Sequence, residues 1–281
     1  MSADRHDAIF HTGPRDAAVH EADCVITRND PVNGEYRLMV LAAPQYILDC
    51  RAGQFFHLLC PASAACQPYL RRPMSIYGYS REKLELQFLY KVTGEGTLAL
   101  AGLVAGQTLN VLGPLGQGFD IHDDWQNLLL VARGVGLATL APLAQEARRL
   151  GRALTAICSA RTPEVLMSVD LFRGLGAKVI TVTDSEATSG IENLRSLIED
   201  QIASPGVDAM FTCGSNRLLS LLQDIGATHN IPGQIALEQQ MACGLGMCQC
   251  CVRPFRSAGR ILQKRVCREG PVFDLQEAVA W

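Results

Sequence analysis

The chain has 281 residues, a formal net charge of -3 and 48% hydrophobic residues. A chain of this length buries a substantial core and exceeds the usual size of one domain. The composition therefore excludes a disordered or fibrous protein, and the near-neutral charge argues against nucleic acid as a partner. No apolar run approaches the ~20 residues that span a bilayer, so we expect no membrane span and a cytoplasmic protein.

The spacing of apolar and turn-forming residues divides the chain into four regions and predicts a multi-domain α+β protein. Residues 1–20 are polar and form an N-terminal extension. Residues 21–122 contain short apolar stretches separated by Pro and Gly, as expected of a small antiparallel β-barrel. Residues 123–232 alternate apolar runs with helical stretches, which predicts a Rossmann-like α/β domain. Residues 233–281 form a small C-terminal arm with a cysteine cluster.

The strongest β signal in the first domain is the stretch LELQFLY, in which every second residue is apolar or aromatic. Strand geometry places such side chains on one face of a strand. The four residues are Leu84, Leu86, Phe88 and Tyr90. Similar short apolar stretches at 36–41 and 54–60 predict two further strands.

The α/β region is predicted from four apolar runs, each followed by a stretch of helical character. The runs are NLLLVA at 127–132, ALTAIC at 153–158, KVITVT at 178–183 and DAMFTC at 208–213. The first helix is expected at about 138–150, because it ends in basic residues followed by a glycine. This alternation predicts a parallel sheet covered by helices.

The clearest chemical signal is Cys243-x4-Cys248-x2-Cys251, followed later by Cys267. The C-x4-C-x2-C opening is the plant-type spacing for a 2Fe-2S cluster, which four thiolates can hold. The glycines of the loop ACGLGMCQCC let the backbone wrap closely and aim its N–H groups at the sulfur atoms. Cys250 lies between two of these residues and cannot easily point the same way as both, so we leave it out of the ligand set.

Two other interpretations of the cluster stay open from the residues alone. Four cysteines also suit a tetrahedral zinc ion, although zinc ligands usually occur as two C-x2-C pairs, and reduced thiols without metal are the third option. The odd total of eleven cysteines and the lack of an export signal argue against a disulfide framework. We predict that six cysteines are ordinary buried thiols. They are Cys24, Cys50, Cys60, Cys66, Cys158 and Cys213.

A second signal is the stretch RRPMSIYGY in the first domain, followed by KVTGEGT. The Arg72 guanidinium suits a diphosphate, and the Ser75 hydroxyl suits a flavin ring or ribityl chain. Gly94, Gly96 and Thr97 are expected to form a small loop whose amides meet phosphate oxygens. Alone, such an arginine is more often a surface charge and such glycines are more often turns, so flavin binding stays open at this point.

A third signal is the segment ARGVGLATLAPLA, which follows a predicted strand and opens a helix. Gly134 and Gly136 permit a tight turn and the close approach of a dinucleotide diphosphate to the helix N-terminus. The motif G-x-G-x-x-G is incomplete, because Thr139 occupies the third glycine position. Cys213 and Gly214 end a later strand at the sheet edge where ligands bind, although a core thiol and a loop glycine explain them equally well.

Taken in this order, the motifs resemble the ferredoxin-NADP reductase-like flavoproteins, and among these the electron transfer subunits of NAD-dependent dihydroorotate dehydrogenase. The resemblance covers roughly residues 21–275. It is carried by RRPMSI, LYKVTGEGT and LGPLGQGF in the first domain, by GVGLA and CGS in the second, and by LEQQMACGLGMCQCC and VCREGPVF in the arm. The combination is specific, even though each flavin motif is not.

The resemblance implies an FAD-binding β-barrel, an NAD(P)-binding domain and a 2Fe-2S arm, with no acid–base catalytic residue for dihydroorotate in this chain. The implied FAD contacts are Arg72, Pro73, Met74, Ser75, Leu89, Tyr90, Lys91, Gly96 and Thr97. The dinucleotide contacts are Gly134, Gly136, Cys213 and Gly214. The cluster ligands are Cys243, Cys248, Cys251 and Cys267.

Two segments depart from the family pattern. Arg133 and Thr139 stand where this class usually has a glycine and often a proline. The segment TDSEATSGIEN lacks the acidic-glycine pattern expected of the dihydroorotate system at that place. These departures concern the pose of the dinucleotide and the substrate of the partner, and leave the expected redox architecture unchanged.

The resemblance also implies the activity, an oxidoreductase function in electron transport for pyrimidine biosynthesis. NAD(H), as a diffusible substrate, exchanges hydride with FAD, and FAD exchanges single electrons with the cluster, because a flavin handles both. The arm then faces an FMN-containing catalytic subunit, so we expect a hetero-oligomer. Two alternatives stay open: an NAD(P)H-dependent reductase component that feeds an oxygenase or other acceptor, and a non-catalytic zinc- or cluster-bearing redox sensor.

Overall fold

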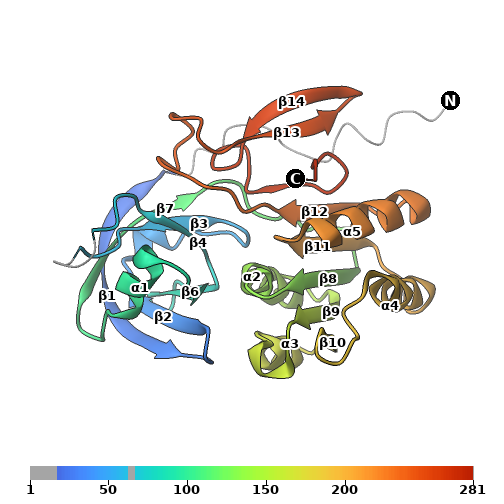
Figure 1. Cartoon of the computed structure of the whole chain (residues 1–281), viewed down its shortest axis with the longest axis horizontal. Helices are drawn as coiled ribbons and strands as arrows, with labels where there is room; N and C mark the ends of the chain where they lie inside the picture. Colours follow the sequence, from blue (N-terminus) through green and yellow to red (C-terminus); the bar gives the residue numbers. More distant parts are fainter. Residues whose placement is uncertain (1–17, 63–66, 281) are drawn as a thin grey trace.

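The computed structural model describes residues 18–62 and 67–280 and arranges them as a curled antiparallel sheet, a mixed sheet with helices, and a small C-terminal hairpin (Figure 1). This order of parts confirms the predicted multi-domain α+β fold class. Cys66 and nearly all of the predicted extension 1–20 lie outside the described residues.

The first sheet has the strand order β4-β3-β7-β1-β2-β6-β5, and every neighbouring pair is antiparallel. Its strands are β1 (His20–Pro31), β2 (Tyr36–Ala42), β3 (Phe55–Leu58), β4 (Arg72–Ser75), β5 (Gly78–Ser80), β6 (Glu85–Lys91) and β7 (Thr108–Leu115), with a 3-10 turn at Gln45–Ile47 and helix α1 at Glu95–Ala101. Within the described residues the edge strands β4 and β5 do not pair with each other, so the predicted barrel is a half-barrel.

The start of β6 corrects one prediction. Leu84 was expected to share a buried face with Leu86, Phe88 and Tyr90, and the last three are indeed buried. Leu84 instead precedes the strand, has φ +55° and is exposed. Its carbonyl accepts a hydrogen bond from the Ala43 amide, which is a turn contact. The alternation of apolar residues therefore begins one residue before the strand does.

The second sheet has the order β10-β9-β8-β11-β12-β15, in which only β15 is antiparallel to its neighbour. Its strands are β8 (Asn127–Arg133), β9 (Ala153–Ala160), β10 (Lys178–Thr183), β11 (Ala209–Cys213), β12 (Gly233–Ala236) and β15 (Val272–Asp274). Its helices are α2 (Gly136–Arg149), α3 (Val169–Gly174), α4 (Ile191–Ala203) and α5 (Asn216–His229), with a 3-10 turn at Pro163–Val165. The predicted parallel sheet is thus confirmed.

Helices cover both faces of this sheet, which explains why its strands are continuous apolar runs. On β8, Leu129 and Val131 pack with the side chains of α4 and α5. The alternate residues Leu128 and Leu130 pack with those of α2 and α3. Each fully buried side chain of this size contributes about 1.5–3 kcal/mol to folding, so the two faces hold the sheet firmly between the helices.

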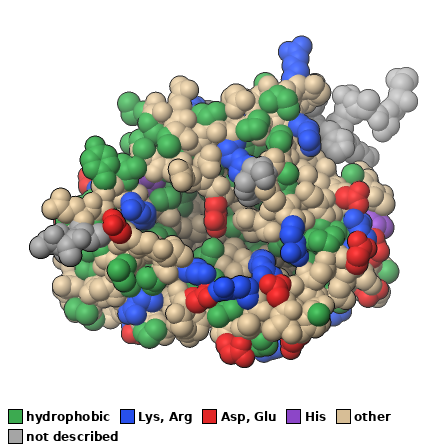
Figure 2. All heavy atoms as spheres, in the orientation of Figure 1, with side chains coloured by type: hydrophobic (Ala, Val, Ile, Leu, Met, Phe, Trp, Pro, Cys, Tyr) green, Lys and Arg blue, Asp and Glu red, His purple; other side chains and the backbone are tan. Residues whose placement is uncertain are grey.

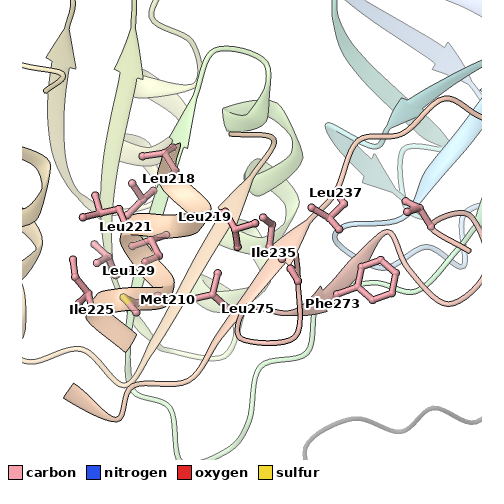
Figure 3. Packing of buried hydrophobic residues seen from close by; sticks show 14 of the residues in the cluster. Leu129, Met210, Leu218, Leu219, Leu221, Ile225, Ile235, Leu237, Phe273 and Leu275 are labelled. Atoms are coloured by element: carbon pink, nitrogen blue, oxygen red, sulfur yellow. The ribbon is translucent and has the colours of Figure 1, made fainter. Parts of the chain in front are cut away.

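The C-terminal arm is joined to both sheets. The antiparallel strands β13 (Val252–Ser257) and β14 (Arg260–Arg265) form its hairpin, while β15 returns to pair with β12 of the mixed sheet. One buried cluster contains Leu237, Phe273 and the apolar side chains of α5, and Ile235 and Leu275 lie between them (Figure 3). The same cluster includes Phe55 of β3. The arm is therefore packed against the rest of the molecule.

None of the helices in the described part of the chain is long and apolar enough to cross a membrane.

Candidate functional site

Four of the clustered cysteines lie as two pairs. The thiols of Cys251 and Cys267 are buried, and their sulfur atoms are 3.2 Å apart. Cys243 is hydrogen bonded to the thiol of Cys248, and this pair lies nearer the surface. Cys250 is exposed, and its thiol contacts the carbonyl oxygen of Gln240 instead. The four predicted ligands therefore form two pairs, and Cys250 belongs to neither pair.

Backbone N–H groups of the loop are aimed at the first sulfur of the cluster motif. The Leu245 amide donates to Cys243 Sγ over 3.3 Å. Burial opposes ionisation of this thiol, but the amides of Cys248, Leu245 and Met247 outweigh it and lower the pKa of Cys243 to about 6. A loop that stabilises a thiolate in this way is prepared to hold a metal centre, because the thiolate is the ligand form.

The paired arrangement fits a two-iron centre better than one zinc ion. A structural zinc site needs four ligands converging on a single point. Within the described residues, no three His, Cys, Asp or Glu side chains converge in that way. Two pairs of thiols can instead supply two ligands to each of two irons, as a 2Fe-2S cluster held by four cysteines requires.

The predicted flavin residues gather where β4 meets the start of α1. Arg72 lies directly over Gly96, and a Cβ at Gly96 would be 2.5 Å from the arginine Nε. A side chain at Gly96 would therefore displace this guanidinium from the turn. The Thr97 hydroxyl accepts hydrogen bonds from the amides of Thr93 and Gly94 over 2.9 and 3.1 Å. The segment predicted as a small loop is the first turn of α1.

The remaining predicted flavin contacts differ in what they offer. Pro73, Met74 and Ser75 follow Arg72 along β4, and all are partly accessible. Leu89 and Tyr90 are buried, and the Tyr90 hydroxyl donates to Asn29 Oδ1 over 2.9 Å inside the half-barrel. Contact with a ligand at Tyr90 is therefore left to its backbone.

A cavity of about 480 Å³ lies between the half-barrel and the mixed sheet. Gly134, Gly136 and Gly214 line it, together with Tyr36 and Lys91 from the half-barrel. Figure 2 shows basic and acidic side chains gathered on this face of the molecule. Three of the four predicted dinucleotide contacts thus share one cavity that both domains enclose.

The glycines of this cavity are required by the backbone. Gly134 has φ +56° and Gly214 has φ +79°, conformations that favour glycine. A Cβ at Gly136 would be 2.8 Å from the carbonyl oxygen of Cys213. Cys213 itself is buried behind that contact, and burial first of all raises the pKa of its thiol to about 12. Its side chain is therefore an inert core group.

Sequence reasoning missed the ion pairs around the cavity. Arg133 donates to both carboxylate oxygens of Asp184, over 3.0 and 2.6 Å. Hydrogen bonds from Arg133 and then Ser189 lower the pKa of Asp184 to about 2. The Arg133 position had been noted as a departure from the family pattern, but no local pattern indicated a partner 51 residues away.

A second set of charges crosses between the two domains. Glu35, in the turn between β1 and β2, pairs with Lys91 over 2.8 Å and with Arg161 after β9. The Lys91 hydrogen bond is the largest cause of a lowered pKa at Glu35. Glu238, next to Gly214, also lines the cavity, and desolvation by the surrounding protein raises the pKa of its carboxyl. The cavity therefore has cations and carboxylates on both walls.

One more side chain near the cysteine loop was not singled out from the sequence. His57 on β3 is completely buried, and both ring nitrogens lack a hydrogen-bond partner among the residues described. Burial, and then the charge of Arg71, lower the pKa of His57 to about 4. A buried neutral imidazole thus lies under the cluster loop.

Comparison with known proteins starts from the arm. Residues 238–279 match the family model of the iron-sulfur cluster binding domain of dihydroorotate dehydrogenase B. These residues contain all four paired cysteines.

Whole-chain relatives extend this match. The dihydroorotate dehydrogenase B (NAD(+)) electron transfer subunit of Caldanaerobacter subterraneus is 36% identical over 81% of this chain and 86% of its own length. The subunit of Streptococcus thermophilus is 32% identical over 82% and 87%. The chain belongs to the family of dihydroorotate dehydrogenase B electron transfer subunits. The resemblance predicted from the motifs is therefore confirmed, and this family consists of oxidoreductase subunits.

Solved structures of other proteins share the fold of this electron transfer subunit. A chain of the NADH-dependent reduced ferredoxin-NADP oxidoreductase superposes with a TM-score of 0.76, covering 92% of this chain and 90% of that one at 24% identity. The ferredoxin reductase of carbazole 1,9a-dioxygenase gives a TM-score of 0.60 over 76% and 67%, at 14% identity. At such identities the likeness shows the fold alone. It is the ferredoxin-NADP reductase-like fold that the motifs predicted.

Proposed function

We propose that this chain carries electrons between NAD(H) and a catalytic flavoprotein partner, through an FAD on the half-barrel and a 2Fe-2S cluster in the arm. The observation that carries the proposal is the two pairs of thiols, Cys243 with Cys248 and Cys251 with Cys267. When bound, FAD supplies the conversion between a two-electron hydride and the single electrons of an iron-sulfur centre. The related chains are named electron transfer subunits of dihydroorotate dehydrogenase B. We propose the catalytic subunit of that enzyme, with FMN in it, as the partner here.

The half-barrel residues are proposed to hold the flavin. Arg72 lies over Gly96 and partly faces solvent, so its guanidinium is available to a diphosphate oxygen. Ser75, at the end of β4, offers a hydroxyl to the ring or the ribityl chain. The other proposed contacts are Pro73, Met74, Leu89, Tyr90, Lys91 and Thr97.

The cavity between the domains is proposed to receive the dinucleotide. Gly134 and Gly136 open α2, and Gly214 precedes α5, so two helix N-termini meet the cavity. N–H groups at such ends favour a diphosphate. Cys213 contributes by its backbone, since its thiol is buried behind Gly136. Arg161 and Lys91 add positive charge to the cavity when they release Glu35, the carboxylate with which both form ion pairs.

The state of the cysteines bears on where the protein works. Every described cysteine is a free thiol, and free thiols fit a reducing compartment. We therefore propose the cytoplasm as the location.

We also propose domain boundaries at residues 20, 122 and 232. These boundaries place β12 and β15 of the mixed sheet with the arm.

Replacing single thiols tests the proposal. Cys267→Ser removes one ligand of the buried pair, and we expect the iron content to fall well below the wild-type value of about two per chain. Cys250→Ser removes the exposed thiol that contacts Gln240, and iron and flavin should stay at wild-type values. Metal analysis and the visible spectrum read both outcomes. Wild-type protein that contains zinc, or Cys267→Ser protein that keeps its iron and still reduces the partner, would refute the proposal.

A further inference from the structure

His57 is the one buried side chain near the cysteine loop whose polar atoms the described structure leaves unused. It lies on β3, has no exposed surface, and neither Nδ1 nor Nε2 has a hydrogen-bond partner within residues 18–62 and 67–280. A buried donor without a partner costs more than a hydrogen bond usually gains. Native proteins therefore rarely keep one unless something else supplies the partner.

The surroundings of the ring show where such a partner would lie. A Cβ built on Gly244 would be 2.9 Å from His57 Nε2 and 3.0 Å from Cε1, so the ring lies against the backbone that follows Cys243. The same point is 3.1 Å from Leu115 Cδ1, and the Phe55 ring is centred 5.7 Å from the imidazole. The side chains of Leu115 and Phe55 offer only carbon, whereas the loop side of the ring carries the polar backbone that follows Cys243.

The loop beside Nε2 is the one that runs from Cys243 to Cys248. Gly244 has φ +70°, a conformation that glycine adopts freely, and its missing Cβ leaves room for the imidazole. Leu115 and Phe55 also belong to the buried cluster that contains Cys251 and Cys267. The half-barrel therefore contacts the loop at Gly244 through His57 and Leu115, and the His57 ring supplies an N–H donor there.

We propose that His57 is a positioning residue for the iron-sulfur centre: its ring N–H donates a hydrogen bond to a sulfur atom of that centre, which seats the centre against β3 and raises its reduction potential. The inference rests on the proposed function, because it needs the centre. Sulfur atoms of a reduced cluster carry more negative charge than those of the oxidised one. A donor aimed at them therefore stabilises the reduced form.

The position on β3 gives this contact a second consequence. His57 pairs in register with Pro73 of β4, the strand on which Arg72 and Ser75 lie. The backbone of His57 is thus paired with the proposed flavin strand, while its ring contacts the cluster loop. His57 therefore links the loop to that strand.

Selective isotope labelling tests the hydrogen bond in the intact protein. Wild-type protein is prepared with 15N-histidine, the cluster is reduced, and pulsed EPR is used to look for 15N coupling to the cluster spin. We expect a coupling that disappears in labelled His57→Phe protein. A well-formed cluster signal with no 15N-histidine coupling would overturn the inference but leave the proposed function intact. Protein with no such cluster signal would refute the proposed function instead.

A redox titration gives an independent measurement. We expect His57→Phe to lower the one-electron equilibrium constant for reduction of the cluster about tenfold. This corresponds to a midpoint potential that is lower by about 59 mV. His57→Gln keeps an N–H donor and should recover part of the shift. His122→Phe is the matched control, because the His122 ring stacks on Trp125 of the segment before β8, with ring centroids 4.2 Å apart. Equal midpoints in wild-type and His57→Phe protein would overturn the inference.

If His57→Phe protein fails to bind iron, the labelled wild-type protein still decides the question. The labelling experiment does not depend on any variant for its negative outcome. Flavin content, read from the visible spectrum, shows whether the half-barrel of each variant is intact.

Discussion

Arg72 is the side chain on which flavin affinity should depend most. Its guanidinium lies over Gly96 and has no carboxylate partner among the residues described, unlike Arg81, which pairs with Asp49. We expect Arg72→Ala to lose a charged hydrogen bond worth about 1.5–3 kcal/mol. The dissociation constant of FAD should therefore rise roughly 10- to 100-fold. Fluorescence of released flavin measures it, with Arg81→Ala as the control, and an unchanged constant in Arg72→Ala would contradict the flavin site.

Glu238 should make stability depend on pH. Desolvation raises the pKa of this carboxyl above its ordinary value of 4.5. Between pH 4.5 and the raised pKa the unfolded chain binds fewer protons than the folded one, so stability falls as the pH rises through that window. Glu238→Gln cannot ionise, and its urea midpoint should fall less over the same range. Parallel pH profiles for the two proteins would show that the raised pKa has no consequence.

At the scale of single residues, sequence reasoning succeeded where the chemistry was local. Cys243 and Cys248 lie on one tight loop and are hydrogen bonded to each other, because a tight loop forces nearby residues together. Sequence reasoning failed for Arg133 and Asp184, which are neighbours only because β8, β9 and β10 lie side by side. Partners brought together by a sheet leave no trace in the local pattern.

The turn between β8 and α2 is the element that should tolerate change least. A Cβ at Gly136 would be 2.8 Å from the Cys213 carbonyl oxygen, so Gly136→Ala must push α2 away from β11. We expect a loss of about 1–3 kcal/mol in unfolding free energy and a slower reduction of FAD by NADH. Urea denaturation and stopped-flow absorbance measure the two effects.

Gly174→Ala is the control for this change. A Cβ at Gly174, in the last turn of α3, meets nothing within 4 Å, and alanine favours a helix. Its stability should equal or slightly exceed that of the wild type. If Gly136→Ala behaved like Gly174→Ala, the close contact between α2 and β11 would not constrain the turn.

A strand or helix was predictable where its own residues show which of its faces are buried. Strand β8 is apolar throughout because helices cover both of its faces, and the run NLLLVA shows this directly. Helix α1 was expected as a loop, because the segment GEGT contains glycines that favour turns. Its helical start depends on Thr97, whose hydroxyl holds the amides of Thr93 and Gly94.

At the scale of the whole molecule, the order of the parts was predictable but their joining was not. The motifs predicted a half of β structure, an α/β half and a cysteine arm in that order. They did not indicate that β15 of the arm completes the mixed sheet beside β12. Nor did they indicate that Glu35 of the half-barrel pairs with Arg161 across the cavity, 126 residues away. Both contacts depend on how folded domains meet.

The exposed apolar side chains of the cluster loop should decide whether the partner binds. Met247 is 81% exposed and lies next to Cys248, and Leu245 lies two residues after Cys243. Because a buried charge without a partner is costly at an interface, we expect Met247→Glu to weaken binding of the catalytic subunit at least tenfold. Iron, flavin and NADH-driven reduction of FAD within the chain should stay unchanged.

Leu98→Glu is the matched control for that change. Leu98 is also exposed, at 65%, but it lies on α1 of the half-barrel, away from the C-terminal arm (Figure 1). Binding of the catalytic subunit, measured by sedimentation or light scattering, should therefore match the wild type. If Leu98→Glu abolished the complex and Met247→Glu did not, the partner would dock on the half-barrel, and electrons would have to leave by a face other than the cysteine loop.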